Sequence, residues 1–483
     1  MASRPILAAL LVAALATPSP ARAWVVRLGT PRSSAGPVVA DASGDVFAAL
    51  HYKLPRYSAG VSILKLSRTN GGTLWKRVLI GPGSEHSDEI HRLLVAADGD
   101  VIAGGGIERN GDVDMFVTRL SGADGDVRWR RFITGAPNRP RYDEVLDMAL
   151  DPSGDVIVVG SLEAPTAPQY HTTGDLAVVK LDGATGVERW RFVLDGSAQD
   201  FDIALVVAVD PSGDVLVGGT LSELGDDPSY DASTGVVLKL AGRDGAPVWR
   251  RTMGVLWRVV SIAADAVGDA VIAGASRVGA GDDFTVAKLS AATGTVVWQT
   301  RTTGSDDRWE EAFDVIALSG GDVAAAGFLA TDTGAPSLSV VSLDGATGAV
   351  RWRRDVQGSD GYGFGRAVVE RGDDLLVGGD LRNLGSCYDV VALGLDEVSG
   401  ATTSEQSVDG RATASVCDFP CEGRGPCGPP RAAIDQDSLG GFAVDPRGRA
   451  ILAGRIYDDS RGRGRAFVAR MPRAPAIARP RVR

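Results

Sequence analysis

The stretch Leu181-Asp182-Gly183-Ala184-Thr185-Gly186-Val187-Glu188-Arg189-Trp190 decides the fold, because versions of it recur along the chain. An apolar run leads into it, Asp and Gly residues turn the chain, and a second run leaves it carrying a Trp. The copies lie about 50–60 residues apart, a spacing typical of a four-stranded propeller blade or a slightly longer unit. Their tryptophans are Trp75, Trp129, Trp190, Trp249, Trp298 and Trp352.

One full repeat extends from residue 143 to residue 196 and predicts four strands. Residues 145–150, 156–160 and 176–181 form the first three (A, B and C), and the fourth (D) lies around Trp190. Val, Ile and Leu dominate strands A to C, as buried strands require. No helical periodicity interrupts the pattern, which indicates an all-β chain.

The turn between strands A and B is rich in Asp, Pro, Ser and Gly and recurs in eight copies. A D strand follows only seven of them, and the seventh is degenerate, with Ser404 in the Trp position. The segment Trp24–Gly29 reads as the end of a repeat without its beginning. We therefore predict an eight-bladed β-propeller of four-stranded antiparallel blades, closed by Trp24–Gly29 pairing outside Phe467–Arg470 in the last blade. Closure would remove the open junction between the first and last blades. The eight turns are marked by Asp45, Asp100, Asp155, Asp214, Asp269, Asp322, Asp374 and Arg449.

Residues 1–23 are typical of a signal peptide, with Arg4 before an apolar run and Ala21-Arg22-Ala23 as a cleavage site. The apolar run is too short for a membrane-spanning helix. We expect an exported chain, periplasmic or extracellular, with the propeller over residues 24–472 and a basic disordered tail over 473–483. The net charge of −11 argues against nucleic-acid binding.

All four cysteines lie late in the chain, at Cys387, Cys417, Cys421 and Cys427. An even number in an exported chain favours two disulfides, and three pairings are open. A metal site is the alternative, but the spacing lacks the His or CxxC pattern of common zinc sites.

The motif Asp182-x3-Gly186-x3-Trp190 resembles the tryptophan-docking motif of PQQ-like propeller repeats. Those repeats occur in quinoprotein dehydrogenases and in the periplasmic scaffold of outer-membrane protein assembly. The unit from Gly196 to Leu240 is also similar to the bacterial cell-surface propeller repeat. The resemblance implies that each docking Trp packs against the neighbouring blade, and the predicted docking set is Trp24, Trp75, Trp129, Trp190, Trp249, Trp298 and Trp352.

The residues do not indicate an enzyme. Resemblance to a PQQ dehydrogenase would imply an adjacent Cys pair beside the cofactor, and none occurs. No G-x-S-x-G or HExxH motif is present, and the four histidines are His51, His86, His91 and His171. We therefore predict no catalytic residue and no cofactor. The alternative is a redox quinoprotein-like or hydrolytic enzyme with its site at the central channel.

Two sets of acidic residues invite a calcium interpretation. The A–B turns offer too few oxygens for calcium and are interpreted as hairpin turns. A second position lies thirteen residues before the first residue of strand B, where the predicted acidic ring is Asp88, Asp143, Asp202, Glu310 and Asp437. This ring could attract a cation at the channel mouth. The structural alternative, which we favour, is that each carboxylate caps its own loop or ties blades together.

Loop lengths indicate where a partner would bind. The A–B and C–D turns share one face of a propeller and are short here. The connections on the other face, which we call the long-loop face, vary, and the insertion 408–439 is the longest. Variable loops on a rigid scaffold usually carry recognition. We predict a monomeric, non-enzymatic binding or scaffold module with a protein or glycan ligand on this face. The alternative role for the insertion is to cover the seam beside degenerate blade seven.

Overall fold

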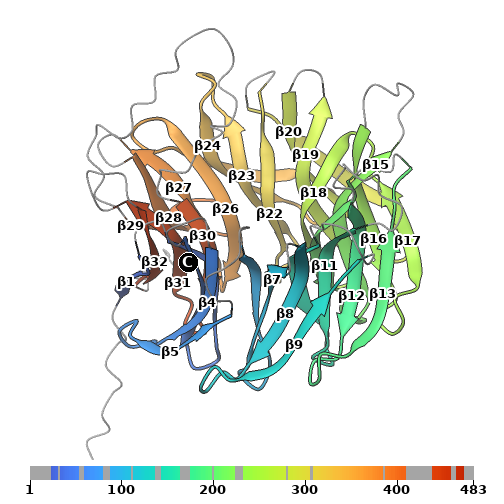
Figure 1. Ribbon diagram of the computed structural model, residues 1–483. Coiled ribbons are helices and arrows are strands. Elements are labelled where there is room, and N and C mark those ends of the chain that lie inside the picture. The colour runs from blue at the N-terminus through green and yellow to red at the C-terminus, as the bar shows by residue number, and fades with distance from the viewer. Residues whose placement is uncertain are drawn as a thin grey trace, which may run out of the picture.

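The computed structural model shows eight four-stranded antiparallel sheets that follow one another round a ring (Figure 1). The predicted all-β, eight-bladed propeller is confirmed. The structure describes residues 23–30, 33–53, 59–79, 88–109, 112–135, 143–163, 174–197, 201–223, 232–278, 281–304, 308–383, 387–408, 438–457 and 464–472.

Each of blades one to seven consists of four strands that are consecutive in the chain. Blades one to three are β2 (Ser34–Ala40), β3 (Val46–Lys53), β4 (Ala59–Leu66), β5 (Thr73–Val78); β6 (Glu89–Val95), β7 (Val101–Arg109), β8 (Asp112–Leu120), β9 (Val127–Ile133); and β10 (Glu144–Leu150), β11 (Val156–Glu163), β12 (Gly174–Leu181), β13 (Glu188–Leu194). Blades four and five are β14 (Ile203–Val209), β15 (Val215–Glu223), β16 (Ala232–Leu240), β17 (Pro247–Thr252); and β18 (Leu256–Ala264), β19 (Ala270–Val278), β20 (Gly281–Leu289), β21 (Val296–Thr302). Blades six and seven are β22 (Glu311–Ala317), β23 (Val323–Ala330), β24 (Pro336–Leu343), β25 (Val350–Val356); and β26 (Tyr362–Arg371), β27 (Asp374–Asn383), β28 (Cys387–Asp396), β29 (Thr402–Val408).

Blade eight is built from both ends of the chain. It contains β30 (Ser438–Val444), β31 (Ala450–Tyr457), β32 (Gly464–Arg470) and, as its outermost strand, β1 (Trp24–Leu28). Trp24 lies opposite Arg470 and Leu28 opposite Ala466 in an antiparallel register. The predicted closure is confirmed, and it removes the seam at which the ring would otherwise be open.

The hydrophobic core lies between the blades. The A strands are innermost, since β10 contacts β6 and β14, the A strands of its neighbours. The second and third strands of blade three, β11 and β12, are buried along their whole length. Their side chains pack on both faces, and one cluster joins Ile102 and Val117 of blade two to Val145 and Val158 of blade three. Each such side chain contributes about 1.5–3 kcal/mol by leaving water.

The repeated Trp holds each blade to the next. The indole N–H of Trp129 in blade two donates to the carbonyl of Gly183 in blade three at 3.0 Å, and Trp190 repeats the contact with Gly242 of blade four at 3.2 Å. The ring of Trp129 lies against Gly186, whose φ is +68° and whose missing Cβ leaves the room that the indole fills. The Gly and the Trp of the motif therefore both lie at the contact between successive blades. The same donation to the following blade is made by Trp24, Trp75, Trp249, Trp298 and Trp352.

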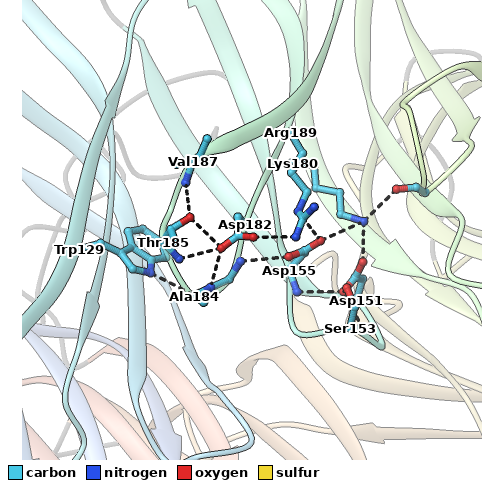
Figure 2. Close-up of polar contacts among 12 residues, drawn as sticks. Trp129, Asp151, Ser153, Asp155, Lys180, Asp182, Ala184, Thr185, Val187 and Arg189 are labelled. Carbon is cyan, nitrogen blue, oxygen red and sulfur yellow. Dashed lines mark hydrogen bonds and ion pairs between the residues drawn. The ribbon is translucent and has the colours of Figure 1, made fainter.

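A buried lysine reinforces the same junction (Figure 2). The ammonium of Lys180 lies 2.6 Å from a carboxylate oxygen of Asp151 and 3.5 Å from one of Asp155, and it donates to the carbonyl of Gly242 at 2.9 Å. The carboxylates of this Asp turn therefore face an ammonium. Asp151 also accepts the amides of Ser153 and Asp155 within the turn, as the hairpin interpretation requires.

Candidate functional site

The A strands that surround the axis all carry a register shift. In β10, for example, Val145 lies opposite Gly160 and Asp147 opposite Val159, so Leu146 has no partner. A β-bulge of this kind inserts an extra residue and re-aims its side chain. The shifts leave unpaired His91, Leu146, Leu205, Phe313, Arg366 and Gly440, together with Gly36 and Pro37 in β2 and Trp257 and Val260 in β18. The bulges place chemically different side chains at one level of the ring.

Charged pairs join neighbouring A strands at this level. Arg92 of blade two lies 3.0 Å from Asp147 of blade three. The second oxygen of Asp147 accepts the amide of Val207 in blade four at 3.0 Å. Burial raises the pKa of Asp147, and the charge of Arg92 and these backbone hydrogen bonds oppose that rise. The carboxylate therefore links three successive blades.

Asp314 of blade six likewise links three successive blades, five to seven. It accepts the hydroxyl of Ser261 at 2.9 Å and the amide of Val368 at 2.8 Å. Burial raises the pKa of Asp314, against these hydrogen bonds and the charge of Arg92. Since Arg92 belongs to blade two and Asp314 to blade six, the charge of the arginine acts across the axis of the eight-bladed ring. The axis at this level is polar and charged.

An aromatic patch lies over blades six and seven, where the A strands begin and the B strands end. We define it as Trp309, Phe313, Phe328, Phe364 and Tyr388. Ring centroids lie 5.0 Å apart for Trp309 and Phe328, 5.4 Å for Phe313 and Phe328, and 5.2 Å for Phe328 and Phe364. Trp309 is 37% exposed and Phe328 is buried beneath it. Figure 1 shows β22 and β26 side by side in the ring.

Arg366 completes this patch. Its guanidinium carbon lies 5.3 Å from the ring centroid of Phe313 and 5.2 Å from that of Phe364. Nε lies 3.0 Å from a carboxylate oxygen of Asp380, which is buried. Burial raises the pKa of Asp380, while the charge of Arg366 lowers it. Stacking and the ion pair hold the exposed arginine in one orientation.

The residues predicted as an acidic ring are buried and hydrogen-bonded where the structure describes them. Asp143 accepts the amide of Gly135, at the end of blade two, at 2.8 Å and that of Glu163 in its own blade at 2.6 Å. Each carboxylate oxygen of Asp143 therefore already accepts a backbone amide, one from each of the two blades. Glu310 accepts the amides of Gly304 and Ala330 in the same way, Asp88 accepts that of Glu108, and Asp202 accepts those of Gly196 and Ser222. Asp437 lies outside the described residues, and cation binding by the ring as a whole stays a prediction.

Two of the four histidines are described. The ring of His51 accepts the amide of Ile90 at 3.1 Å, and burial, with the charge of His91, lowers the pKa of His51 to about 4. His91 lies 2.6 Å from Glu144. Although burial disfavours the imidazolium, the hydrogen bond to Glu144 and the charges of Glu144 and Glu89 raise the pKa of His91. Both are therefore tied to neighbouring groups, and His86 and His171 lie outside the described residues.

Of the four cysteines, Cys387 alone lies within the described residues, so the predicted disulfides stay predictions. The sequence pattern predicts Cys387 in the B–C loop of blade seven, and this is wrong, because Cys387 is the first residue of β28. Cys417, Cys421 and Cys427 lie outside the described residues, as do residues 409–437 of the insertion, the segment 1–22 and the tail 473–483. No helix long and apolar enough to cross a membrane lies in the part of the chain that the structure describes.

These features define an eight-bladed β-propeller of docked repeats with a polar axis and an aromatic patch at one end. Residues 174–390 match the sequence model of the family described as outer membrane protein assembly factor BamB. The resemblance to PQQ-like repeats is confirmed for this stretch. A comparison with curated proteins finds none of similar sequence.

Several solved structures share the fold. Sqt1 of Chaetomium thermophilum, bound to the N-terminus of the ribosomal protein L10, has 13% identity and a TM-score of 0.55 over 93% of this chain and 98% of its own. The quinohemoprotein alcohol dehydrogenase ADHIIG from Pseudomonas putida has 11% identity and a TM-score of 0.50 over 94% and 76%. BamB from Moraxella catarrhalis has 15% identity and a TM-score of 0.44 over 94% and 98%. At such identities the likeness to Sqt1 and to the dehydrogenase shows the fold alone.

Sequence reasoning missed both the bulged residues and the aromatic patch. Phe313 and Arg366 occupy corresponding places in β22 and β26, so aligning the A strands would have paired them in neighbouring blades. The sequence gives no signal of these extra residues, because they add one or two positions to each A strand without changing its hydrophobic pattern. Trp309 lies outside the repeat motif and resembles an ordinary loop residue in sequence.

Proposed function

We propose that the chain is an exported, non-enzymatic binding or scaffold module that holds a protein partner on its long-loop face. The aromatic patch with Arg366 carries this proposal. Trp, Tyr and Arg are the side chains that most often dominate the binding energy of protein interfaces. Here an exposed Trp309 rests on a buried Phe328, so little conformational entropy is lost when a partner covers it.

Two further observations support a protein partner. The matched family is described as an assembly factor, and the Sqt1 propeller was solved with the N-terminus of another protein bound. A rigid ring suits such a role, because the Trp and Lys contacts between blades fix the A strands that present Phe313 and Arg366. The alternative of a quinoprotein-like enzyme at the channel predicts a quinone-like absorbance in the purified protein.

Site-directed photo-crosslinking tests the proposal. A benzophenone amino acid is placed at Trp309, and at Val267 as the control. Val267 is 75% exposed in a tight A–B turn at the opposite end of the ring. The chain is then irradiated in envelope and medium fractions of the native cell. We expect one protein crosslinked from position 309 and none from 267, with its binding weakened by Trp309→Ala but unchanged by Val267→Ala. Equal crosslinking at both positions, or a glycan as the only ligand, would overturn the proposal.

A further inference from the structure

An aspartate recurs near the start of the C strands, six residues before the leucine at their far end. In three blades its carboxylate has a partner. Asp114 lies 3.3 Å from Arg109, and Asp283 lies 3.3 Å from Arg301. Asp389 accepts a hydrogen bond from the side-chain amide Nδ2 of Asn383 at 2.7 Å. The position is partly or fully buried, and a buried carboxylate needs such a partner.

The aspartate at this position in blade three differs from the other three in its surroundings. Asp175 occupies the same position, and its carboxylate lies beside those of Asp195 and Asp202, with the nearest oxygens within 4.8 Å of one another. Asp175 is only 8% exposed, and no donor or cation among the described residues pairs with it. Burial, together with the charges of Asp195 and Asp202, raises the pKa of Asp175 to about 6. Among the described residues no cation offsets the charge of Asp175, whereas Arg109 and Arg301 do so for the corresponding aspartates of blades two and five.

The fold forces these three carboxylates together. Leu176 pairs with Leu194 across β12 and β13, so Asp175 and Asp195 adjoin the same end of that ladder. Like charges in such cross-strand positions are destabilising. Asp202 cannot turn away, because Ser222 donates its amide to one oxygen at 2.6 Å and Gly196 donates to the other.

We propose that Asp175, Asp195 and Asp202 bind one divalent cation, and that this cation is calcium. Two oxygens that share a calcium ion at about 2.3–2.6 Å can lie at most about 4.6–5.2 Å apart, which accommodates the observed spacing. Magnesium usually keeps several waters and is bound through one or two carboxylates, so a set of three carboxylates favours calcium. Asp195 is exposed, so the ion can enter from solvent and keep water in its remaining positions. The site goes beyond the proposed partner binding and does not depend on it.

Calorimetric titration of the chelator-treated full chain with calcium chloride tests the site. We expect the wild type to bind calcium in preference to magnesium and Asp175→Asn to lose that binding. Asp283→Asn is the matched control, since it changes the corresponding aspartate of blade five, which already has Arg301. It should bind calcium as the wild type does. Absence of calcium binding by the folded wild type, or equal loss in both variants, would overturn the proposal.

A gain-of-charge variant provides a second, independent test. Arg301 lies opposite Thr285 in blade five, and the corresponding pair in blade three is Val193 opposite Ala177. Val193→Arg therefore supplies the cation that blade five uses. In chelator it should raise the melting temperature above that of the wild type, and added calcium should raise it no further. A wild type whose melting temperature does not respond to calcium, or a variant that responds as strongly as the wild type, would contradict the proposal.

Discussion

Replacing Gly186 with alanine tests the packing of one blade against the next. Gly186 has φ of +68°, and an added Cβ would lie 2.6 Å from Cε3 of Trp129. The left-handed backbone costs a non-glycine residue about 1–2 kcal/mol. Forcing a methyl group into the indole adds about 1–3 kcal/mol, as overpacking does in other cores. We expect Gly186→Ala to lower the free energy of unfolding by about 2–5 kcal/mol.

Gly154 provides the matched control. Its φ is +84°, also left-handed, but an added Cβ would meet nothing within 4 Å. Gly154→Ala should therefore cost only the backbone strain, about 1–2 kcal/mol. Urea unfolding followed by circular dichroism measures both variants, alone and combined with Trp129→Ala. In the Trp129→Ala background the two glycine variants should cost the same. Equal costs in the wild-type background, or a difference that survives removal of the indole, would refute the packing argument.

Two other changes test the electrostatic contacts. Lys180→Ser should lower the free energy of unfolding by about 3–5 kcal/mol because it leaves buried Asp151 unpaired. Adding Asp151→Leu should restore part of the lost stability, because blade six carries Leu318 and Ser342 where blade three carries Asp151 and Lys180. If urea unfolding shows that the two substitutions cause additive losses, this reasoning is wrong. Burial lowers the pKa of His51 to about 4 in the folded chain, from 6.5 in the unfolded chain. The neutral imidazole therefore stabilises the fold above pH 6.5, and this contribution is lost as pH falls toward 4. His51→Gln should therefore show a smaller fall in melting temperature between pH 7 and pH 5 than the wild type, and an unchanged fall would count against burial of the neutral ring.

The features that the sequence predicted are those that every blade repeats. A Trp that docks on the next blade must recur with the period of the blade, and so must the glycine that receives it. The count of eight and the place of Trp24 in blade eight followed from this one motif, because an orphan D strand at the start balanced a missing one at the end. Periodic residues can be predicted without coordinates because each copy supports the interpretation of the others.

The features that the sequence did not reveal are those in which one blade departs from the rest. Asp175 looks like Asp283 in sequence, and only the contacts show that one faces two carboxylates and the other an arginine. Phe313 and Arg366 likewise meet only because bulges in two blades place them in contact. Departures of this kind depend on residues from different strands, whose distances no spacing rule supplies.

The two faces of the ring carry different features. The indole of Trp190 and the ammonium of Lys180 both donate to the carbonyl of Gly242, in the C–D turn of the following blade. The Trp and Lys contacts that recur round the ring are thus made where the tight turns lie. On the long-loop face, Asp143 and Glu310 bond the end of one blade to the next. Trp309 and Asp175 take no part in those bonds, so a substitution can add a Trp or remove an arginine beside them without opening a blade junction. This explains why both Trp309 and the Asp175 cluster occur at the long-loop end, and it predicts that losing either leaves the ring intact.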